Sequence, residues 1–267
     1  MTQPLVTILV PHYKTLELTK LCLRLLRKHT NLALAKIIVI DNDSQDDSLA
    51  YLRTLSWIEL IERRAIPGES PVQSHAHALD MALDRVTTPY VLSIHTDTLV
   101  KHPAWLTFLI DQIEKRPTIA GVGSWKLESK SWLRRLLKYF EHSFQRFYYF
   151  LIGKTNHGLA GIGKNYYYLR SHCAMYRTDL LKQLNLHFGD GDKVAGKEMH
   201  KRLVEAGYEM LFLPSDVLIR YLEHINHATV VLNPHLSSRQ KSVDKGLKRI
   251  KASIARLQAS VEHDATT

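Results

Sequence analysis

Three short apolar runs, each ended by polar side chains, constrain the fold of this chain more than any other feature. The runs are residues 5–10, 37–40 and 90–94, and the second contains only Ile and Val. Strands covered on both faces of a parallel sheet have this continuous apolar character. Residues 18–25 and 75–86 place apolar side chains at helical spacing between the runs. The alternation predicts an α/β fold with an open, mostly parallel sheet flanked by helices.

The same alternation continues beyond the first strands. We expect further strands at 58–61, 119–122, 173–176 and 210–213, and further helices at 44–55, 105–116, 178–184 and 196–206. Segment 131–153 is rich in aromatic and basic residues, and residues 242–261 have the spacing of a basic helix. The expected fold therefore adds an aromatic and basic helical segment and a C-terminal helix to the sheet.

Polar side chains follow each of the first three apolar runs. Ligands of open α/β sheets bind outside the carboxyl ends of the strands, so these side chains are candidates for function. They are His12, Tyr13, Asp41, Asn42, Asp43, His95 and Asp97. Asp41 directly ends a strand and can accept hydrogen bonds from a ribose or a base, whereas Asp43 or Ser44 suits the start of the next helix. We expect the acidic and imidazole groups to converge and to hold a pyrophosphate with its cation.

The triplet His95-Thr96-Asp97 is a candidate metal site. Mg²⁺ is bound through one or two carboxylates together with phosphate oxygens, and Mn²⁺ accepts nitrogen as well as oxygen ligands. Asp97 beside an imidazole therefore suits Mn²⁺, with an aspartate in a turn as the structural alternative. His224 arrives from distant sequence and is a candidate for a further ligand, although a lone histidine is more often structural.

Three acids near residue 195 are candidates for a general base. Asp190 and Asp192 flank Gly191 in an expected loop, and Glu198 opens a predicted helix. A reaction in which a hydroxyl group attacks a carbon needs a general base, such as a carboxylate, that takes the proton of the hydroxyl. An acid in a first helical turn is also stabilised by the helix dipole, so both interpretations of Glu198 stay open.

The net charge of +10 and the two cysteines limit the binding partners and the cellular compartment that we expect for the protein. A basic chain attracts nucleic acid, anionic lipid or phosphate-bearing substrates. Cys22 and Cys173 lie in apolar patterns, where buried free thiols and a reducing compartment are expected. No signal peptide is recognisable and no run approaches the ~20 apolar residues of a membrane span. We therefore expect a cytoplasmic protein, soluble or peripheral on the inner face of the membrane.

Segment 131–153 has two interpretations. It mixes aromatic side chains with Arg134, Arg135, Lys138 and Arg146, as does a helix that lies on an anionic bilayer. The same aromatic residues can instead pack inside the protein or form a dimer face, so an oligomer stays open. A nucleic-acid-binding module would use the charge and the aromatic rings. The charge is spread over the chain, however, and no nucleic-acid-binding motif is visible, so no nucleic acid is expected.

The order of these pieces resembles a family 2 glycosyltransferase with the GT-A fold. The segments that carry the resemblance are VTILVPHYK, IIVIDNDSQDDS, PGESPVQSHAHALDMAL, YVLSIHTDTLVKHPAWL, SHCAMYRTDLL, KEMHKRLVEAGYEMLFLP and RYLEH. The resemblance implies a glycosyltransferase domain at 1–230, with a nucleotide-binding half at about 1–125 and an acceptor half at about 126–230. A basic helical extension at 231–267 would follow this domain.

The resemblance also implies roles for individual residues. The nucleotide-sugar donor would contact Pro11, Tyr13, Asp41, Asn42, Asp43, His77, His95 and Thr96. A divalent cation, Mn²⁺ or Mg²⁺, would bind Asp97 with His95 and His224. Glu198 would be the catalytic base, with Asp192 as the second choice. Two positions depart from the family pattern: His95 replaces the first acid of the Asp-x-Asp motif, and the usual Glu-Asp pair near Glu198 is not intact.

The implied activity is transfer of a hexosyl or related sugar from a nucleotide-sugar donor to a hydroxyl of a saccharide or lipid-linked acceptor, with inversion. Assembly of cell-surface polysaccharide or lipopolysaccharide is the implied setting, and contact with an anionic membrane is part of it. Two alternatives come from other classes. One is the nucleic-acid-binding module, and the other is a catalytically silent, glycosyltransferase-like partner subunit.

Overall fold

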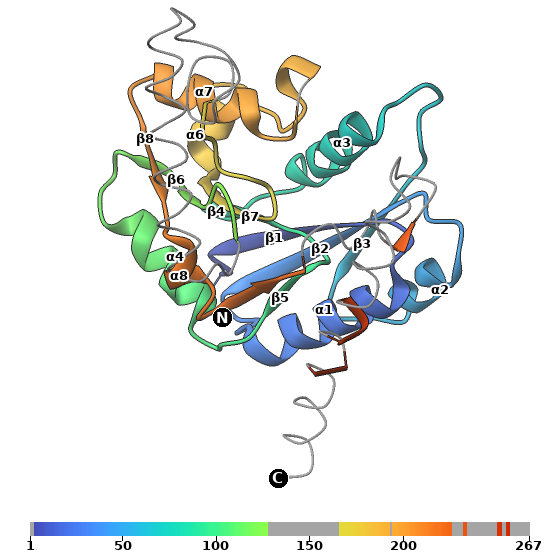
Figure 1. The fold of residues 1–267 in the computed structure, drawn as a ribbon. Coiled ribbons are helices and arrows are strands. Elements are labelled where there is room, and N and C mark those ends of the chain that lie inside the picture. Colours follow the sequence, from blue (N-terminus) through green and yellow to red (C-terminus); the bar gives the residue numbers. More distant parts are fainter. Residues whose placement is uncertain are drawn as a thin grey trace, which may run out of the picture.

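The computed structural model describes residues 3–127, 166–192 and 194–225, with the short pieces 232–233, 250–252 and 255–256 (Figure 1). The side chain of Asp192 is outside this description. The predicted segment 131–153 also lies outside the described residues. The same holds for the predicted helix 242–261, apart from the two short pieces at its centre, which are helical.

A seven-stranded sheet forms the centre of the described fold. Its spatial order is β3 (Glu59–Arg63), β2 (Ala35–Asn42), β1 (Val6–His12), β4 (Tyr90–Ile94), β7 (Cys173–Arg177), β6 (Ile119–Gly123) and β8 (Glu209–Phe212). Within this sheet only β7 runs against the other strands, because it pairs antiparallel with both β4 and β6. The predicted α/β fold with a mostly parallel sheet is confirmed.

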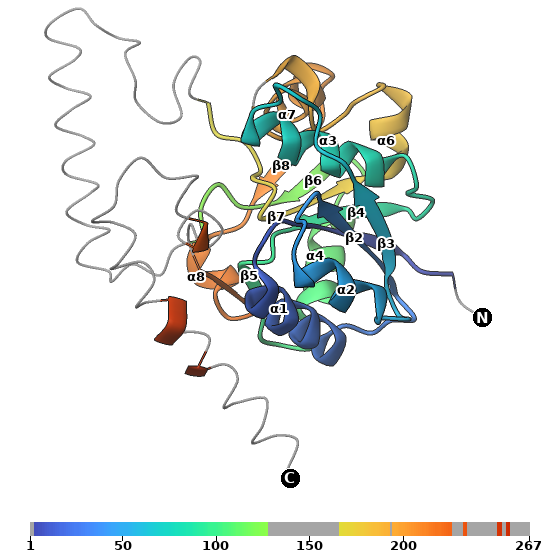
Figure 2. The ribbon, with the colours of Figure 1, turned by 90° about the vertical axis from the view of Figure 1, so that its right-hand side faces the viewer.

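Helices cover both faces of the sheet (Figures 1 and 2). On one face lie α1 (Leu16–His29), α2 (Asp47–Arg53) and α4 (Trp105–Glu114), and on the other lie α3 (Pro71–Leu83), α6 (Thr178–Gln183) and α7 (Lys197–Glu205). Side chains of a strand alternate between its faces, so Ile8 and Val10 pack on the α1 side while Leu9 packs on the α3 side. No helix in the described part of the chain has the length and apolar character needed to cross a membrane.

The first strand continues through Pro11, where the sequence pattern predicts its end. Proline has no N–H to donate to a neighbouring strand, and a central strand has neighbours on both sides. The β1–β4 pairing ends at Leu9 and Ser93, and only the β1–β2 pairing continues to His12. Pro11 therefore lies where a strand partner remains on one side only, and the missing donor is tolerated.

The second helix begins later than predicted. Its N-cap is Asp46, whose carboxylate accepts a hydrogen bond from the Ser48 amide, so the predicted cap at Asp43 or Ser44 is wrong. Ser44 instead accepts a hydrogen bond from the Lys14 amide. Both Asp43 and Gln45 have positive φ, which keeps this stretch out of the helix.

A small second sheet was not predicted from the sequence. It joins β5 (Thr98–Val100) to β9 (Leu222–His224) in antiparallel pairing, with Thr98 opposite His224, and a short helix α8 (Ser215–Leu218) precedes β9. Asp190–Asp192 forms a 3-10 turn (η2) with Gly191 at φ 75°, in place of the expected loop. Cys22 and Cys173 are both buried and free, as predicted.

Candidate functional site

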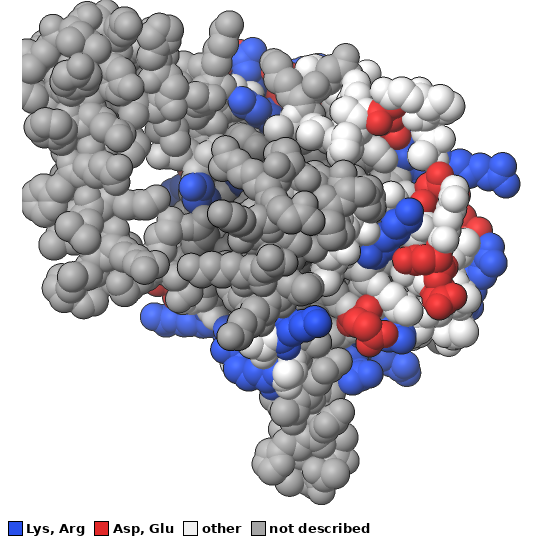
Figure 3. All heavy atoms as spheres, turned by 45° about the vertical axis from the view of Figure 1, so that its right-hand side comes forward, with Lys and Arg blue, Asp and Glu red and all other residues white. Residues whose placement is uncertain are grey.

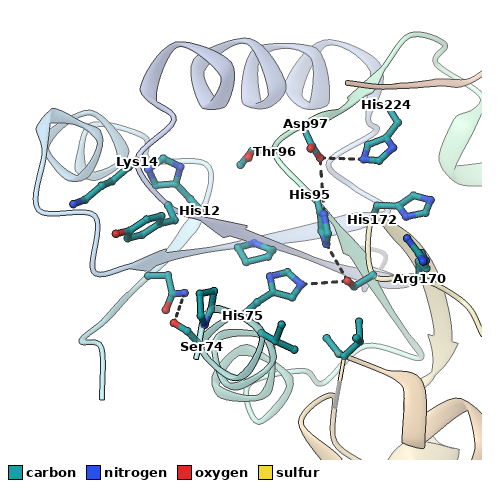
Figure 4. Close-up of a pocket in the computed structure, with 18 of the residues that line it drawn as sticks. His12, Lys14, Ser74, His75, His95, Thr96, Asp97, Arg170, His172 and His224 are labelled. Atoms are coloured by element: carbon teal, nitrogen blue, oxygen red, sulfur yellow. Dashed lines mark hydrogen bonds and ion pairs between the residues drawn. The ribbon is translucent and has the colours of Figure 1, made fainter. Parts of the chain in front are cut away.

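A cavity of about 970 Å³ opens at the carboxyl edge of the parallel strands (Figure 4). Its wall includes most of the side chains that the sequence singles out. Nine of the candidate residues line it: Pro11, His12, Tyr13, Asn42, Asp43, His95, Thr96, Asp97 and His224. The expected convergence at one edge of the sheet is therefore present for these residues.

Asp41 lies behind the cavity wall rather than on it. Its position in β2 directs its side chain to the α1 face, like that of His12, its partner in the β1–β2 register. Asp41 Oδ2 accepts a hydrogen bond from the Ser44 amide, and Oδ1 is 3.8 Å from His12 Nε2. Burial lowers the pKa of His12, although the charge of Asp41 opposes this shift. Asp41 shapes the turn after β2, and the predicted direct contact with a ligand lacks support.

Asn42 points to the opposite face, where a buried network fixes its amide. Arg63 donates to Asn42 Oδ1 at 2.7 Å, and Asn42 Nδ2 donates to Ser74 Oγ at 2.9 Å. Arg63 is held in turn by Glu69 at 2.5 and 2.7 Å. Burial acts to raise the pKa of Glu69, but hydrogen bonds from Arg63 and His77 outweigh it and lower the pKa. The Asn42 side chain is therefore held in one orientation at the cavity.

His77 makes a contact beside the cavity and does not line it. Its Nδ1 lies 2.5 Å from Glu69 Oε1, and 41% of its side chain is exposed. The residue two positions earlier, His75, lines the cavity instead. The prediction that His77 contacts the donor lacks support from this placement, since α3 presents its neighbour to the site.

Four histidines surround Asp97 and Ser171, and we call His75, His95, His172 and His224 the imidazole cluster. His95 Nε2 and His75 Nε2 lie 2.9 and 3.2 Å from Ser171 Oγ. The ring of His172 stacks on that of His224 with 4.8 Å between centroids, and His172 Nε2 lies 3.0 Å from Ser124 Oγ. These contacts fix the rings at the centre of the cavity (Figure 4).

Burial favours the neutral form of three rings of the imidazole cluster, those of His75, His95 and His172. It lowers the pKa of His75 to about 4 and that of His172 to about 3. The pKa of His95 is lowered well below its usual value, first by burial and then by the neighbouring His75. A neutral imidazole retains a lone pair, so at neutral pH these rings can ligate a metal or accept a hydrogen bond.

Sequence reasoning missed one wall of the cavity, which consists of Trp125, Tyr168, Arg170, Ser171 and His172. The candidates from the first three apolar runs follow the ends of parallel strands, which is where ligands of such sheets bind. Strand β7 is antiparallel, and its first residue, Cys173, lies opposite Ile94 at the end of β4. The residues before β7 therefore reach the same edge as the residues after β4. The sequence offers no local signal for this reversal.

The acids near residue 195 lie at the margin of the site. Glu198 is in the first turn of α7, as predicted, and accepts a hydrogen bond from Lys201 at 3.3 Å. Asp190 accepts hydrogen bonds from the His187 amide and from Arg202. The cavity wall here is formed by Val194 and Ala195, and neither Glu198 nor Asp190 lines it. Glu198 is therefore close in sequence to residues of the wall but does not line the cavity, and its role as base stays a prediction.

Comparison with known proteins identifies the family. The sequence pattern described as "Glycosyl transferase family 2" matches residues 7–185, which is most of the chain. The chain belongs to glycosyl transferase family 2. No curated protein matches this family 2 glycosyltransferase.

Solved structures similar to the family 2 chain have the same fold. The mannosyltransferase PcManGT from Pyrobaculum calidifontis, solved with GDP-Man and Mn²⁺, is 18% identical with a TM-score of 0.55; the match covers 99% of this chain and 81% of that one. TarS 1–349 from S. aureus is 14% identical with a TM-score of 0.53, and the match covers 86% of this chain and 62% of that one. These likenesses confirm the GT-A-like fold.

The donor groups around Asp97 suit the divalent ion that the family implies. Asp97 Oδ1 lies 3.3 Å from His224 Nε2 and 3.9 Å from His95 Nδ1. The β5–β9 pairing brings His224 to this place, and its buried Nδ1 has no hydrogen-bond partner among the described residues. No described group of three or more His, Cys, Asp or Glu side chains could by itself hold a metal. A carboxylate and one imidazole, completed by phosphate oxygens, fit an ion that binds together with its substrate.

Proposed function

We propose that this family 2 chain transfers a sugar from a nucleotide-sugar donor to a hydroxyl of a saccharide or lipid-linked acceptor, with inversion at the sugar carbon. The observation that carries the proposal is the single cavity that brings the residues after β1, β2 and β4 together around Asp97. In open α/β sheets this edge is the ligand-binding edge.

The donor nucleoside is proposed to lie at the end of the cavity formed by Tyr13, Lys14 and Asn42. Asn42 offers a fixed amide, and the aromatic ring of Tyr13 has the Lys14 ammonium 5.3 Å from its centroid. A planar base can stack on such a ring and exchange hydrogen bonds with the amide. Figure 4 shows this end on the opposite side of the cavity from Arg170, with His95 and Asp97 between them.

The donor diphosphate is proposed to lie beside Asp97 at the centre of the cavity. Asp97 and His224 would hold a divalent ion, Mn²⁺ or Mg²⁺, and His95 adds a nitrogen donor nearby. The bound ion would supply neutralisation of the charge on the leaving diphosphate. Because nitrogen donors outnumber the single carboxylate, we expect Mn²⁺ to bind more tightly than Mg²⁺.

The transfer step needs a base for the acceptor hydroxyl. In the proposed reaction the hydroxyl oxygen forms a bond to the sugar carbon, the bond from that carbon to the diphosphate oxygen breaks, and the hydroxyl proton passes to a carboxylate. Glu198, with Asp192 as second choice, stays a prediction for this base. The nucleoside diphosphate leaves with the electron pair of the broken bond.

A screen of sugar nucleotides by thermal unfolding tests the proposal. A ligand that binds the native state raises the unfolding temperature, so at least one UDP- or GDP-sugar should stabilise the protein, and more strongly with Mn²⁺. The Asp97→Asn variant should lose the Mn²⁺-dependent part of the shift and most of the transfer activity, about 100-fold or more. Asp84→Asn, which removes an exposed carboxylate from the end of α3, is the matched control.

Other results would point to the rival functions. Normal turnover in Asp97→Asn would remove the metal-site assignment. Stabilisation by a sugar nucleotide without any transfer or donor hydrolysis would identify a catalytically silent partner subunit. No stabilisation by any sugar nucleotide, together with oligonucleotide binding that weakens steeply with salt, would identify a nucleic-acid-binding module.

The biological setting is part of the proposal. A cytoplasmic location, with contact to an anionic membrane and action in cell-surface polysaccharide or lipopolysaccharide assembly, fits a lipid-linked acceptor. Segment 131–153, on which the membrane contact depends, lies outside the described residues. Co-sedimentation with vesicles that contain anionic lipid tests the membrane contact. Equal binding to neutral and anionic vesicles would contradict an electrostatic contact.

A further inference from the structure

Arg170 occupies the end of the cavity that the proposed nucleoside does not reach (Figure 4). Its backbone is fixed, because the Arg170 amide donates to the Ser124 carbonyl at 3.0 Å and its carbonyl accepts from the Cys173 amide at 3.1 Å. Its guanidinium carbon lies 4.4 Å from the centroid of a Trp125 ring and 5.9 Å from that of Tyr168. The two aromatic rings hold a positive charge at the cavity wall.

The charge of Arg170 lacks an acidic partner. No carboxylate in the described part of the chain forms an ion pair with it, and its buried Nε has no hydrogen-bond partner there. Burial raises the pKa of Tyr168, and both the charge of Arg170 and a hydrogen bond from it oppose that rise. The Tyr168 hydroxyl is thus a hydrogen-bond partner of the Arg170 guanidinium. A hydroxyl is uncharged, so it does not neutralise the positive charge of Arg170.

Other buried or partly buried arginines in the described part of the chain are compensated differently. Arg63 is paired with the carboxylate of Glu69. Arg177 donates to the backbone carbonyls of Ile119 and Ile113, so its fork is used within the fold. Removing a charge from water costs free energy unless hydrogen bonds or an opposite charge offset it. Within the described residues, neither a carboxylate nor a backbone carbonyl accepts a hydrogen bond from the Arg170 guanidinium, and Arg170 lines the cavity.

We propose that Arg170, framed by Trp125 and Tyr168, forms a subsite for an oxyanion, a phosphate or a carboxylate, on the ligand at the sugar side of the cavity. The planar guanidinium can donate two parallel hydrogen bonds to such a group. The adjacent Trp125 ring supplies an apolar surface against which a sugar ring can pack. The choice of the sugar side rests on the proposed function, because it assumes that the nucleoside binds near Lys14.

The oxyanion has two possible sources, an acceptor or the transferred sugar itself, and two experimental arms separate them. The first arm measures binding of glycerol 3-phosphate and of glucose to the full chain with Mn²⁺ and saturating UDP or GDP. The second arm measures binding of UDP-glucose and UDP-glucuronate. Each is done by calorimetry on the wild type and on Arg170→Gln, Arg170→Lys and Arg27→Gln. Arg27 is the matched control, since its guanidinium also lies over a tryptophan, Trp57, at 5.7 Å, but outside the cavity.

The expected result is a loss confined to oxyanion ligands. Arg170→Gln should lower the affinity for glycerol 3-phosphate or for UDP-glucuronate about 10-fold or more, as expected when a charged hydrogen-bonding group is lost. The affinities for glucose and UDP-glucose should be unchanged. Arg170→Lys should retain part of the affinity, because it keeps the charge but loses the fork. If Arg170→Gln lowers the affinity for glycerol 3-phosphate, the oxyanion belongs to the acceptor. If it lowers the affinity for UDP-glucuronate, the oxyanion belongs to the transferred sugar.

Two outcomes would overturn the subsite. One is equal affinity for both oxyanion ligands in the wild type and in an Arg170→Gln protein that unfolds at the wild-type temperature. The other is a loss of affinity for UDP or GDP alone that is as large as the loss for the oxyanion ligands, which would assign Arg170 to the diphosphate. If no nucleotide binds but inorganic phosphate binds and depends on Arg170, the subsite stands and the proposed glycosyltransferase function fails.

Discussion

His200 carries a pH dependence that a single substitution can isolate. Burial lowers the pKa of His200 to about 4 from an ordinary value of 6.5. The unfolded chain takes up a proton as the pH falls through 6.5, whereas the folded chain does so only near pH 4. The stability present above pH 6.5 is therefore lost progressively as the pH falls toward 4. The contribution is about 2 kcal/mol between pH 7 and pH 5.

Urea unfolding of the wild type and of His200→Gln at pH 7 and pH 5 measures this contribution. Gln can still accept the hydrogen bond that the Leu169 amide gives to His200 Nδ1. The wild type should lose more stability than the variant over this interval. Equal losses in the two proteins would show that His200 becomes protonated as readily in the folded chain as in the unfolded one.

Glu198 has a matched partner on the same helix, Glu205, about two turns further along, which makes its predicted role as base testable. Lys201 forms ion pairs with both Glu198 and Glu205, at 3.3 and 3.5 Å. If Glu198 is the base, Glu198→Gln should lower kcat by about 100-fold or more with little change in donor affinity, because proton transfer occurs only in the reaction step. Glu205→Gln should leave kcat unchanged. Equal activity of the two variants would leave Glu198 with the role of an acid that stabilises the start of α7.

Individual residues show where sequence reasoning fails. Asp41 ends an apolar run and was expected at the ligand, but the alternation of side chains along β2 turns it toward α1 and turns Asn42 toward the cavity. Likewise the resemblance selects His77, whereas α3 presents His75. Which of two neighbouring residues meets a ligand depends on the face that packing buries, and a strand with apolar residues on both faces does not reveal that face.

At the scale of the elements, Asp80 joins α3 to the chain before η2. Its carboxylate accepts hydrogen bonds from the Phe188 and Gly189 amides at 2.6 and 3.0 Å. Asp80→Ala should leave both donors without this acceptor and lower the free energy of unfolding by about 1–3 kcal/mol. Asp80→Asn keeps one acceptor oxygen and should lower it less.

Urea unfolding at pH 7 provides the measurement for the Asp80 variants. Asp84→Ala, one helical turn further along α3, is the control, because Asp84 is exposed and a surface substitution changes stability by about 0.5 kcal/mol or less. If Asp80→Ala were no less stable than Asp84→Ala, the link between α3 and residues 188–189 would contribute nothing to folding.

The elements themselves were largely predictable, and their connections were not. Apolar periodicity found the seven strands of the main sheet and most helices, because burial enforces that periodicity. Apolar periodicity did not predict the sheet β5–β9, because strands of three residues are too short to show a periodic pattern. The start of α2 was misplaced because Asp43, Ser44 and Asp46 all suit a cap, and only the backbone conformation selects Asp46.

At the scale of the whole molecule, the described basic side chains on the face drawn in Figure 3 do not form one continuous patch. On the face in Figure 3, described acidic side chains lie among the lysines and arginines. Several basic residues of the described part of the chain belong to ion pairs, such as Arg53 with Glu62 and Lys36 with Glu59. A nucleic-acid-binding face is expected to present basic side chains without such acidic neighbours. The described surface therefore favours the proposed transferase over the nucleic-acid-binding alternative.

The fold class and the family were accessible from the sequence because they depend on the order of many segments. The division into domains at 1–230 and 231–267 stays a prediction, since much of the chain after residue 225 lies outside the described residues. The cavity could be foreseen in part. Its nucleotide side follows from the rule for parallel strands, whereas its Arg170 side depends on one reversed strand.

The reversed strand gives the chain a modular plan. Leu127 and Tyr168 both line the cavity, so both ends of the stretch that joins β6 to β7 lie at the ligand-binding edge of the sheet. Evolution could lengthen, shorten or exchange that stretch while the strands that carry the donor-binding residues kept their register. If the proposed nucleotide end of the cavity is right, acceptor preference could change beside an unchanged donor site, which makes the junctions near 127 and 168 natural positions for chimaeras between relatives.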